Sequence, residues 1–249
     1  MTDTDRNVRK RHEVEHGRLL SRGDTEKLWG WGTPAGRLRA IRRAGLIQDG
    51  AGLTSGFKVL EVGCGTGMFT EIFSQSGAAI VAVDISADLL EKARERGLPG
   101  GQVLFLEKPF EECDVDGPFD AVIGSSILHH LDMDVAMRRI FNLLKPGGIV
   151  SFAEPNLLNP QVYLERKLHF LPMFAYVSPD ETAFVRWKLA KQLKSIGFTG
   201  IEITPFDWLH PAVPESLIHA VKRVEGVLER LPIIREFAGS LYIRCRRQQ

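Results

Sequence analysis

Three glycines at every second position, Gly63, Gly65 and Gly67, mark the part of the sequence with the clearest chemical meaning. They follow an apolar run at 59–62 and precede a segment with helical periodicity, so they belong to a loop between a strand and a helix. Glycine tolerates positive φ and lets a ligand approach the backbone without meeting a Cβ atom. N–H groups at the start of the following helix favour an anionic group. The spacing therefore predicts a ligand-binding loop, although a tight turn without a ligand would have a similar local sequence.

Two acidic residues accompany this loop. Glu61 lies on the strand just before it, and Asp84 ends the next apolar strand. A carboxylate at the end of that second strand can accept hydrogen bonds from two vicinal ribose hydroxyls. Asp84 could instead cap the following helix, but Ser86 already supplies a cap. We therefore expect Asp84 to bind a ribose and Glu61 to organise the loop from below.

The glycine spacing is G-x-G-x-G, not the G-x-G-x-x-G that admits the pyrophosphate of a dinucleotide. The run VLEVGCGTG at 59–67 resembles the first motif of the class I S-adenosylmethionine (SAM)-dependent methyltransferases. FDAVIGSSILHHL at 119–131 and LLKPGGIVSFAEPN at 143–156 resemble the fourth-strand and fifth-strand motifs of the same superfamily. The resemblance covers roughly residues 55–246. It implies SAM as the cofactor and S-adenosylhomocysteine as its product.

The resemblance also implies which residues contact the cofactor. They lie in the glycine loop and at the ends of the first four strands: Glu61, Gly63, Cys64, Gly65, Gly67, Asp84, Ile85, Glu107 and Ser125. Glu61 would hold the loop or the methionine amino group, and Ser125 would lie near the methionine end. The Gly-Asp pair that often follows the third strand is missing. Glu107, Glu111 or a backbone contact beside Phe110 could hold the adenine instead, and we expect Glu107.

Three further residues, His129, His130 and Glu154, could act on the methyl acceptor. Methyl transfer from a sulfonium is an in-line displacement, so positioning supplies much of the acceleration. A base is needed only when the acceptor loses a proton, and either histidine could be that base. Alternatively, His130 caps the following helix and His129 packs beneath the loop. Glu154 could orient an amine or hydroxyl acceptor, or bond the backbone of the segment that follows it.

The elements around these motifs alternate between strands and helices. Five apolar strands separated by helical segments predict a parallel sheet covered on both faces; they span 57–62, 78–84, 102–106, 119–124 and 149–153. A helix over 181–196 and strands near 201–204 and 240–244 follow. Together they resemble a doubly wound, seven-stranded α/β sheet, mostly parallel with an antiparallel last strand.

The segments outside this core predict a cover for the acceptor. We expect an N-terminal helical lid segment at 1–50 and a SAM-binding domain at 51–249 with insertions at 155–180 and 206–238. Long insertions in a compact domain tend to be functional. An aromatic-lined acceptor cavity and a second small core are both consistent with the composition of these segments, which contain Trp29, Trp31, Phe170, Phe174, Tyr176, Trp208 and His210. Four arginines at 37, 39, 42 and 43 belong to the lid or form a solvated helix face.

The composition narrows the class of protein. A net charge of +1 gives no indication of a nucleic-acid or membrane partner, and no apolar run reaches the ~20 residues of a membrane-spanning helix. The charged N-terminus is unlike a signal peptide. Cys64, Cys113 and Cys245 match no zinc spacing, so no metal is expected and a reducing cytoplasmic compartment fits best.

The sequence therefore predicts a cytoplasmic SAM-dependent methyltransferase, monomeric or homodimeric. Its acceptor is expected to be the hydroxyl or amine of a small or medium-sized, partly apolar metabolite. Two alternatives have different sequence requirements. A non-catalytic SAM-binding regulatory or partner protein would need the same cofactor motifs, whereas a nicotinamide-dependent oxidoreductase would need the glycine spacing that is missing here.

Overall fold

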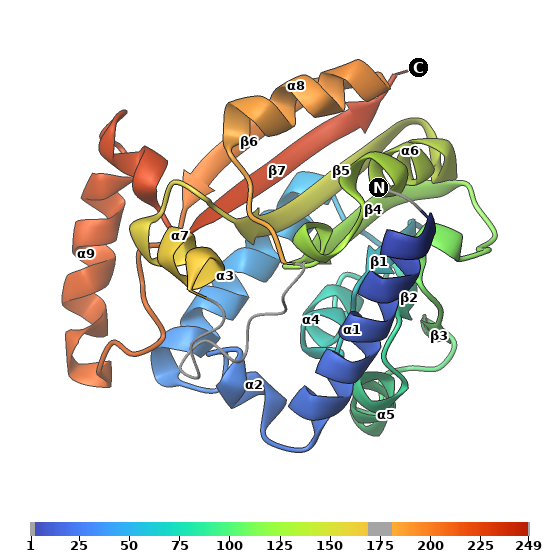
Figure 1. Cartoon of the computed structure of the whole chain (residues 1–249), viewed down its shortest axis with the longest axis horizontal. Helices are drawn as coiled ribbons and strands as arrows, with labels where there is room; N and C mark the ends of the chain where they lie inside the picture. The colour runs from blue at the N-terminus through green and yellow to red at the C-terminus, as the bar shows by residue number, and fades with distance from the viewer. Residues whose placement is uncertain (1–2, 169–180, 249) are drawn as a thin grey trace.

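The computed structural model describes residues 3–168 and 181–248. Its centre is a seven-stranded sheet in the order β3-β2-β1-β4-β5-β7-β6, in which β7 is antiparallel to both of its neighbours (Figure 1). The predicted fold class is confirmed. The strands are β1 Lys58–Val62, β2 Ala79–Asp84, β3 Val103–Glu107, β4 Phe119–Ser125, β5 Leu144–Pro155, β6 Phe198–Phe206 and β7 Ser240–Arg247.

Helices cover both faces of this sheet. They are α1 Asp3–Ser21, α2 Thr25–Leu28, α3 Pro34–Ala51, α4 Met68–Ser74, α5 Ala87–Glu95, α6 Met133–Leu143, α7 Pro160–Lys167, α8 Arg186–Ile196 and α9 Ile218–Leu228. Successive side chains of a strand point to opposite faces. Leu60 and Val62 accordingly pack in one core with α6 and α8, whereas Val59 packs in a second core with α3, α4 and α5.

The ends of two helices follow local sequence signals. The Ser86 hydroxyl caps α5 by accepting a hydrogen bond from Leu89 N, as the sequence predicts. The Asp132 carboxylate caps α6 by accepting one from Val135 N, which excludes the alternative that His130 caps this helix. Ser86 and Asp132 thus fix where α5 and α6 begin after the chain has passed the carboxyl edge of the sheet.

The predicted helix over 181–196 begins five residues later, at Arg186. Residues 181–185 are held as an extended segment by long-range contacts. Thr182 N donates to the backbone oxygen of His129, and Phe184 forms an isolated bridge with Asn156. These contacts compete with helix formation and place Glu181 beside the end of β4.

The N-terminal segment divides into two parts. The carboxyl ends of the strands are covered by α1 and α2: Gly17 of α1 packs against Ser86, and Arg9 donates to the backbone oxygen of His129. In contrast, α3 packs Ala44 and Ile47 against the sheet. The expectation of a lid over residues 1–50 is therefore wrong for 34–50, because the apolar stripe of α3 belongs to a core. In the described part of the chain, every helix is too short or too polar to cross a bilayer.

Candidate active site

A cavity of about 290 Å³ opens at the carboxyl ends of β1, β2 and β4. In parallel α/β sheets this edge is where ligands bind. The glycine loop forms its floor, α1 and α2 contribute one wall, and the first insertion contributes another. Predicted site residues in its lining are Gly63, Cys64, Gly65, Asp84, Ile85, Ser125, His129 and His130.

The glycine loop requires its glycines for two different reasons. Gly63, Gly65 and Gly67 all have positive φ, at 67°, 52° and 74°. A Cβ atom on Gly65 would project into the cavity, 3.1 Å from Trp29 Cη2. One on Gly67 would instead meet Ala93 of α5 at 3.0 Å, outside the cavity. Gly65 therefore leaves room for a ligand, and Gly67 lets α5 approach the loop.

Asp84 links the loop to the start of α5. One carboxylate oxygen accepts from Gly65 N at 2.8 Å and the other accepts from Ser86 N at 2.9 Å. An ionised carboxylate offers about four acceptor positions, so each oxygen retains one for a ligand hydroxyl. Burial raises the pKa of Asp84, while the N–H groups of Ser86 and Gly65 act against that rise. The geometry fits a ribose diol, as the cofactor requires.

Other polar groups in the cavity also suit SAM. The Thr66 side chain lines the cavity, and its buried hydroxyl has no hydrogen-bond partner among the described residues. Because that hydroxyl oxygen is buried, Thr66 contributes to the cavity lining through its other atoms. Ser125 lies at the opposite wall, at the end of β4, where the resemblance expects the methionine end.

Glu61 lies beneath the loop and outside the cavity lining. Burial raises its pKa to about 8. This location suits the expected support of the loop. Glu61 does not line the cavity, and its expected contact with the methionine amino group stays a prediction.

The adenine prediction needs correction. Glu107 is exposed at the end of β3 and lines neither the cavity nor the hollow beside it. The chain turns at Pro109 into a 3₁₀ helix, η1 Phe110–Glu112, which brings Phe110 and Glu111 into the lining of that adjoining hollow. Asp84 lines both spaces. Of the three possibilities left open by the sequence, the structure favours the Phe110–Glu111 turn.

His129 and Glu154 form a buried pair. The Nδ1 atom of His129 lies 2.7 Å from Glu154 Oε2, and the other oxygen of Glu154 accepts from Ile127 N and Leu128 N. Glu154 is 0% exposed and outside the cavity lining. The expectation that Glu154 orients the acceptor is therefore wrong. Its carboxylate lies behind His129 and fixes the ring, because two backbone donors already hold it there.

The protonation states of this pair follow from burial. Burial lowers the pKa of His129 well below its usual value and raises that of Glu154 to about 7. A neutral imidazole that donates from Nδ1 to Glu154 keeps its Nε2 lone pair free. His129 lines the cavity, and its Nε2 atom lies 3.7 Å from Glu181 Oε2. The arrangement can therefore accept a proton from a ligand.

His130 has a different environment. Its Nδ1 lies 2.9 Å from Glu13 of α1, and its Nε2 lies 3.8 Å from Glu181. Burial alone would lower the pKa of His130, but the hydrogen bond and charge of Glu13, with the charge of Glu181, raise it. The contact between His130 and Glu13 thus ties α1 to the end of β4.

One group of side chains could hold a cation. The donor atoms of His129, His130 and Glu181 lie within 4.8 Å of one another. Each already has a charged neighbour: Glu154 for His129, Glu13 for His130 and, at 2.8 Å, Arg166 for Glu181. These contacts account for the three side chains as parts of an ion-pair network.

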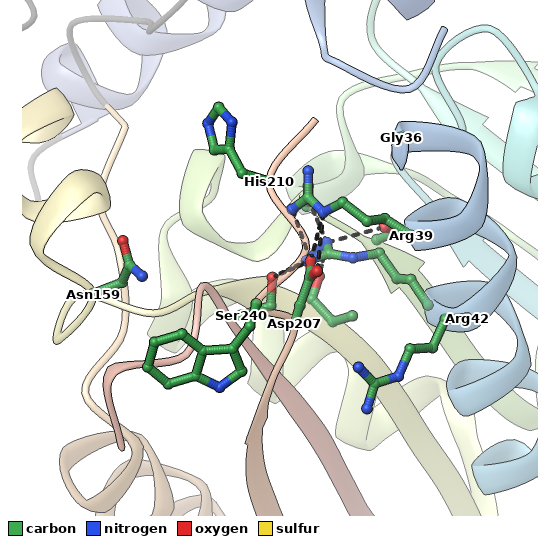
Figure 2. A network of polar contacts seen from close by, with 12 residues as sticks. Gly36, Arg39, Arg42, Asn159, Asp207, His210 and Ser240 are labelled. Carbon is green, nitrogen blue, oxygen red and sulfur yellow. Dashed lines mark hydrogen bonds and ion pairs between the residues drawn. The ribbon is translucent and has the colours of Figure 1, made fainter. Parts of the chain in front are cut away.

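Arg43 is a site residue that sequence reasoning missed. It is 2% exposed and donates to Ser126 Oγ at 2.8 Å and Ser240 Oγ at 2.5 Å. Arg39 also forms an ion pair with Asp207 (Figure 2). Arg42 forms ion pairs with Glu225 and Glu229. Only Arg37 of the four arginines is fully exposed, so the solvated-face alternative fails. The spacing of these arginines in the sequence does not indicate their partners, because the partners lie more than 80 residues away in sequence.

The two insertions have different positions. Pro155, Glu165, Arg166 and Glu181 at the first insertion line the cavity. Residues 206–238 contribute none of its lining, which corrects the expectation for the second insertion. That insertion leaves from β6, the outermost strand, and packs Leu209 and Ile218 against Ala35 in a small core. Phe170, Phe174 and Tyr176 lie outside the described residues.

Comparison with known proteins supports the same family. Residues 59–148 match the model of a methyltransferase domain. The ubiquinone biosynthesis O-methyltransferase of Bordetella bronchiseptica is 34% identical over 180 residues, 66% of this chain and 73% of the relative. The enzyme of the same name from Escherichia coli is 29% identical over 211 residues, 78% and 87% of the two chains.

A solved structure shows the same fold over nearly the whole chain. The N-methyltransferase NodS from Bradyrhizobium japonicum, determined with S-adenosylhomocysteine, has a TM-score of 0.66 at 16% identity and covers 96% of this chain and 100% of its own. The glycine loop, Asp84 and the order of the strands agree with this assignment. The chain therefore belongs to the class I SAM-dependent methyltransferases.

Proposed function

We propose that this methyltransferase transfers its methyl group to the hydroxyl of an aromatic small molecule. The observation that carries the proposal is the His129–Glu154 pair, which presents an uncharged imidazole to the cavity. A hydroxyl must lose its proton as its oxygen is methylated, and a neutral histidine with a carboxylate behind it suits that task. The relatives named as ubiquinone biosynthesis O-methyltransferases support the same acceptor atom.

The chemistry needs one proton acceptor. SAM supplies an electrophilic methyl group whose bond to sulfur breaks as the bond to the acceptor oxygen forms. His129 takes the hydroxyl proton at Nε2 during that attack. The ionised form of Glu154 then stabilises the imidazolium through Nδ1–H. The backbone donors of Ile127 and Leu128 favour that ionised form, against the burial that raises the pKa of Glu154 to about 7.

The cavity wall supports an aromatic acceptor. Trp29, Trp31 and Phe69 line it, and Trp31 and Phe69 meet edge to face with ring centroids 5.6 Å apart. Such rings provide a flat apolar surface on which another ring can pack. A phenolic hydroxyl has a pKa of about 10, as in tyrosine, so a histidine can accept its proton more readily than that of an aliphatic alcohol.

The test is transfer of a labelled methyl group to one of two matched probes. Catechol offers aromatic hydroxyls, and 2-phenylethylamine offers an aromatic ring with an amine. We expect labelled methoxyphenol from catechol and no labelled product from the amine, by mass spectrometry. Label on the amine alone would overturn the hydroxyl assignment. SAM binding without turnover on either probe or on cell extract would favour a regulatory role.

A further inference from the structure

We propose that Asp207, which lies outside the cavity, is a positioning residue that sets two walls of the acceptor site through Arg39 and Arg43. The proposal rests on the proposed function only for the identity of the acceptor. The proposal gives the second insertion, residues 206–238, a role in positioning the acceptor site although none of its residues lines the cavity.

The backbone N–H, the backbone oxygen and the carboxylate of Asp207 all form hydrogen bonds. The residue follows β6 directly, is 6% exposed and has φ of +79°, which is uncommon for a residue other than glycine. Its N–H donates to Glu229 at 3.0 Å, and its backbone oxygen accepts from Gly239 at 2.9 Å. These bonds offset the backbone strain and aim the carboxylate at α3 (Figure 2).

The first link runs from Asp207 to Trp31. Arg39 donates to Asp207 through Nε at 2.9 Å and through Nη2 at 2.7 Å, a two-pronged ion pair. The Cζ atom of the same guanidinium lies 5.2 Å from the centroid of the Trp31 ring. Trp31 lines the cavity. Asp207 thus fixes the position of the Arg39 guanidinium, which packs on the Trp31 ring in the cavity wall.

The second link runs from Asp207 to the end of β4. Ser240 Oγ lies 3.5 Å from Asp207 Oδ2 and accepts from Arg43, whose guanidinium also lies 5.5 Å from the Trp31 ring centroid. Arg43 further donates to Ser126, a cavity residue with φ of +55°. One buried cation therefore joins Trp31 to the strand end where the methyl group must be presented.

The charges explain why Asp207 matters to both links. Arg39 and Arg43 approach the same tryptophan ring and repel each other, and Asp207 is the carboxylate that faces both of them. Loss of its charge removes the carboxylate that pairs with Arg39 and leaves Arg43 with Glu154 as an acidic neighbour. We expect the ring of Trp31 to shift and the acceptor to bind less well. The glycine loop and Asp84 do not touch this network, which meets the cofactor site only where Arg43 donates to Ser125 Oγ at 3.4 Å. SAM binding should therefore change less than acceptor binding.

The decisive variant is Asp207→Asn. Asparagine tolerates positive φ and keeps one acceptor oxygen, so the charge is the main property removed. The matched control is Glu236→Gln, which breaks the buried end of an ion pair from the same insertion to Arg186 of α8. That pair does not contact Arg39, Arg43 or Trp31. It reports what loosening the insertion does without disturbing the proposed links.

Two measurements separate positioning from a merely structural role. The first is ¹⁹F NMR of protein labelled with 5-fluorotryptophan, in which the Trp31 resonance is identified by its loss in Trp31→Phe. We expect Asp207→Asn to move this resonance and Glu236→Gln to leave it in place. The second is kinetics with catechol, in which KM should rise about 3- to 30-fold. The Kd of S-adenosylhomocysteine should stay within about 2-fold of the wild-type value.

The outcomes keep this inference distinct from the proposed function. If wild-type protein does not methylate catechol, the acceptor assignment fails while the NMR measurement still decides the link to Trp31. An unmoved Trp31 resonance in Asp207→Asn, or an equal loss of SAM and acceptor affinity, would overturn the positioning role. If Asp207→Asn does not fold, Arg39→Lys tests the same link, because lysine keeps the charge but loses the planar two-pronged contact. An unmoved resonance there would also overturn it.

Discussion

Glu154 Oε2 lies 2.7 Å from His129 Nδ1, and the carboxylate has no exposed surface. In this pair the Glu154 carboxylate lies on the side of His129 away from the cavity, and Nε2 of His129 is the ring nitrogen left to react. This order differs from the one expected from the sequence, in which Glu154 itself met the acceptor. It leads to a prediction on how activity depends on pH.

Glu154→Gln should lower kcat by a factor on the order of 10² with little change in KM, because the imidazolium formed during transfer loses its counter-charge. Burial raises the pKa of Glu154 to about 7, so wild-type activity should fall as the pH drops below about 7 and the carboxylate gains a proton. Burial also lowers the pKa of His129. Loss of the carboxylate lowers that pKa further, so the acid limb of the kcat profile should move to lower pH. Rate profiles from pH 5 to 9, with Glu236→Gln as control, measure this. An acid limb that moves upward would contradict the role.

Asp84→Asn should weaken SAM binding. The amide can still accept from one backbone N–H but loses the charge and acceptor positions that the ribose diol needs. Hydrogen bonds to a charged group contribute about 1.5–3 kcal/mol, so Kd should rise by roughly 10- to 150-fold. Asp88→Asn, on the first turn of α5, is the matched control and should bind normally. Calorimetry with S-adenosylhomocysteine decides it, and equal affinity of the two variants would exclude ribose binding by Asp84.

Gly65→Ala and Gly67→Ala should have different effects, although both glycines have positive φ. The added methyl group costs each variant about 1–2 kcal/mol of backbone strain. At Gly65 it also enters the cavity beside Trp29, so SAM affinity should fall well beyond that of Gly67→Ala. At Gly67 it presses on α5, so the melting temperature should fall more. Parallel binding and thermal-unfolding curves compare the two, and identical losses of affinity would mean that the loop acts only through its shape.

The ion pair between Glu13 and His130 should make the docking of α1 depend on pH. The pKa of His130 is raised in the folded state. The stabilisation by this ion pair is therefore fully present below the unfolded-state pKa of about 6.5, and it is lost as the pH rises through the folded-state pKa. Glu13→Gln should therefore destabilise the protein by about 1–3 kcal/mol at pH 6 and by much less at pH 9. Denaturant unfolding at both values measures the difference. Glu15→Gln, exposed on the same helix, should show no such trend.

The sequence by itself determined the sheet and the cofactor loop. Strand, glycine loop and capped helix are local patterns. Gly65, Asp84 and Ser86 each act within a few residues of their partners or on a neighbouring strand end. Parallel strands bring their carboxyl ends to one edge of the sheet. These local motifs therefore meet there without any signal from residues distant in the sequence.

Only the tertiary structure decided which polar groups face the acceptor. Glu154 lies behind His129, where two backbone donors hold its carboxylate. Glu107 ends β3 as expected but is exposed. Arg43, Glu13 and Glu181 meet partners far away in sequence or on another element. Such contacts depend on how helices and insertions pack across the sheet, and no local periodicity encodes that packing.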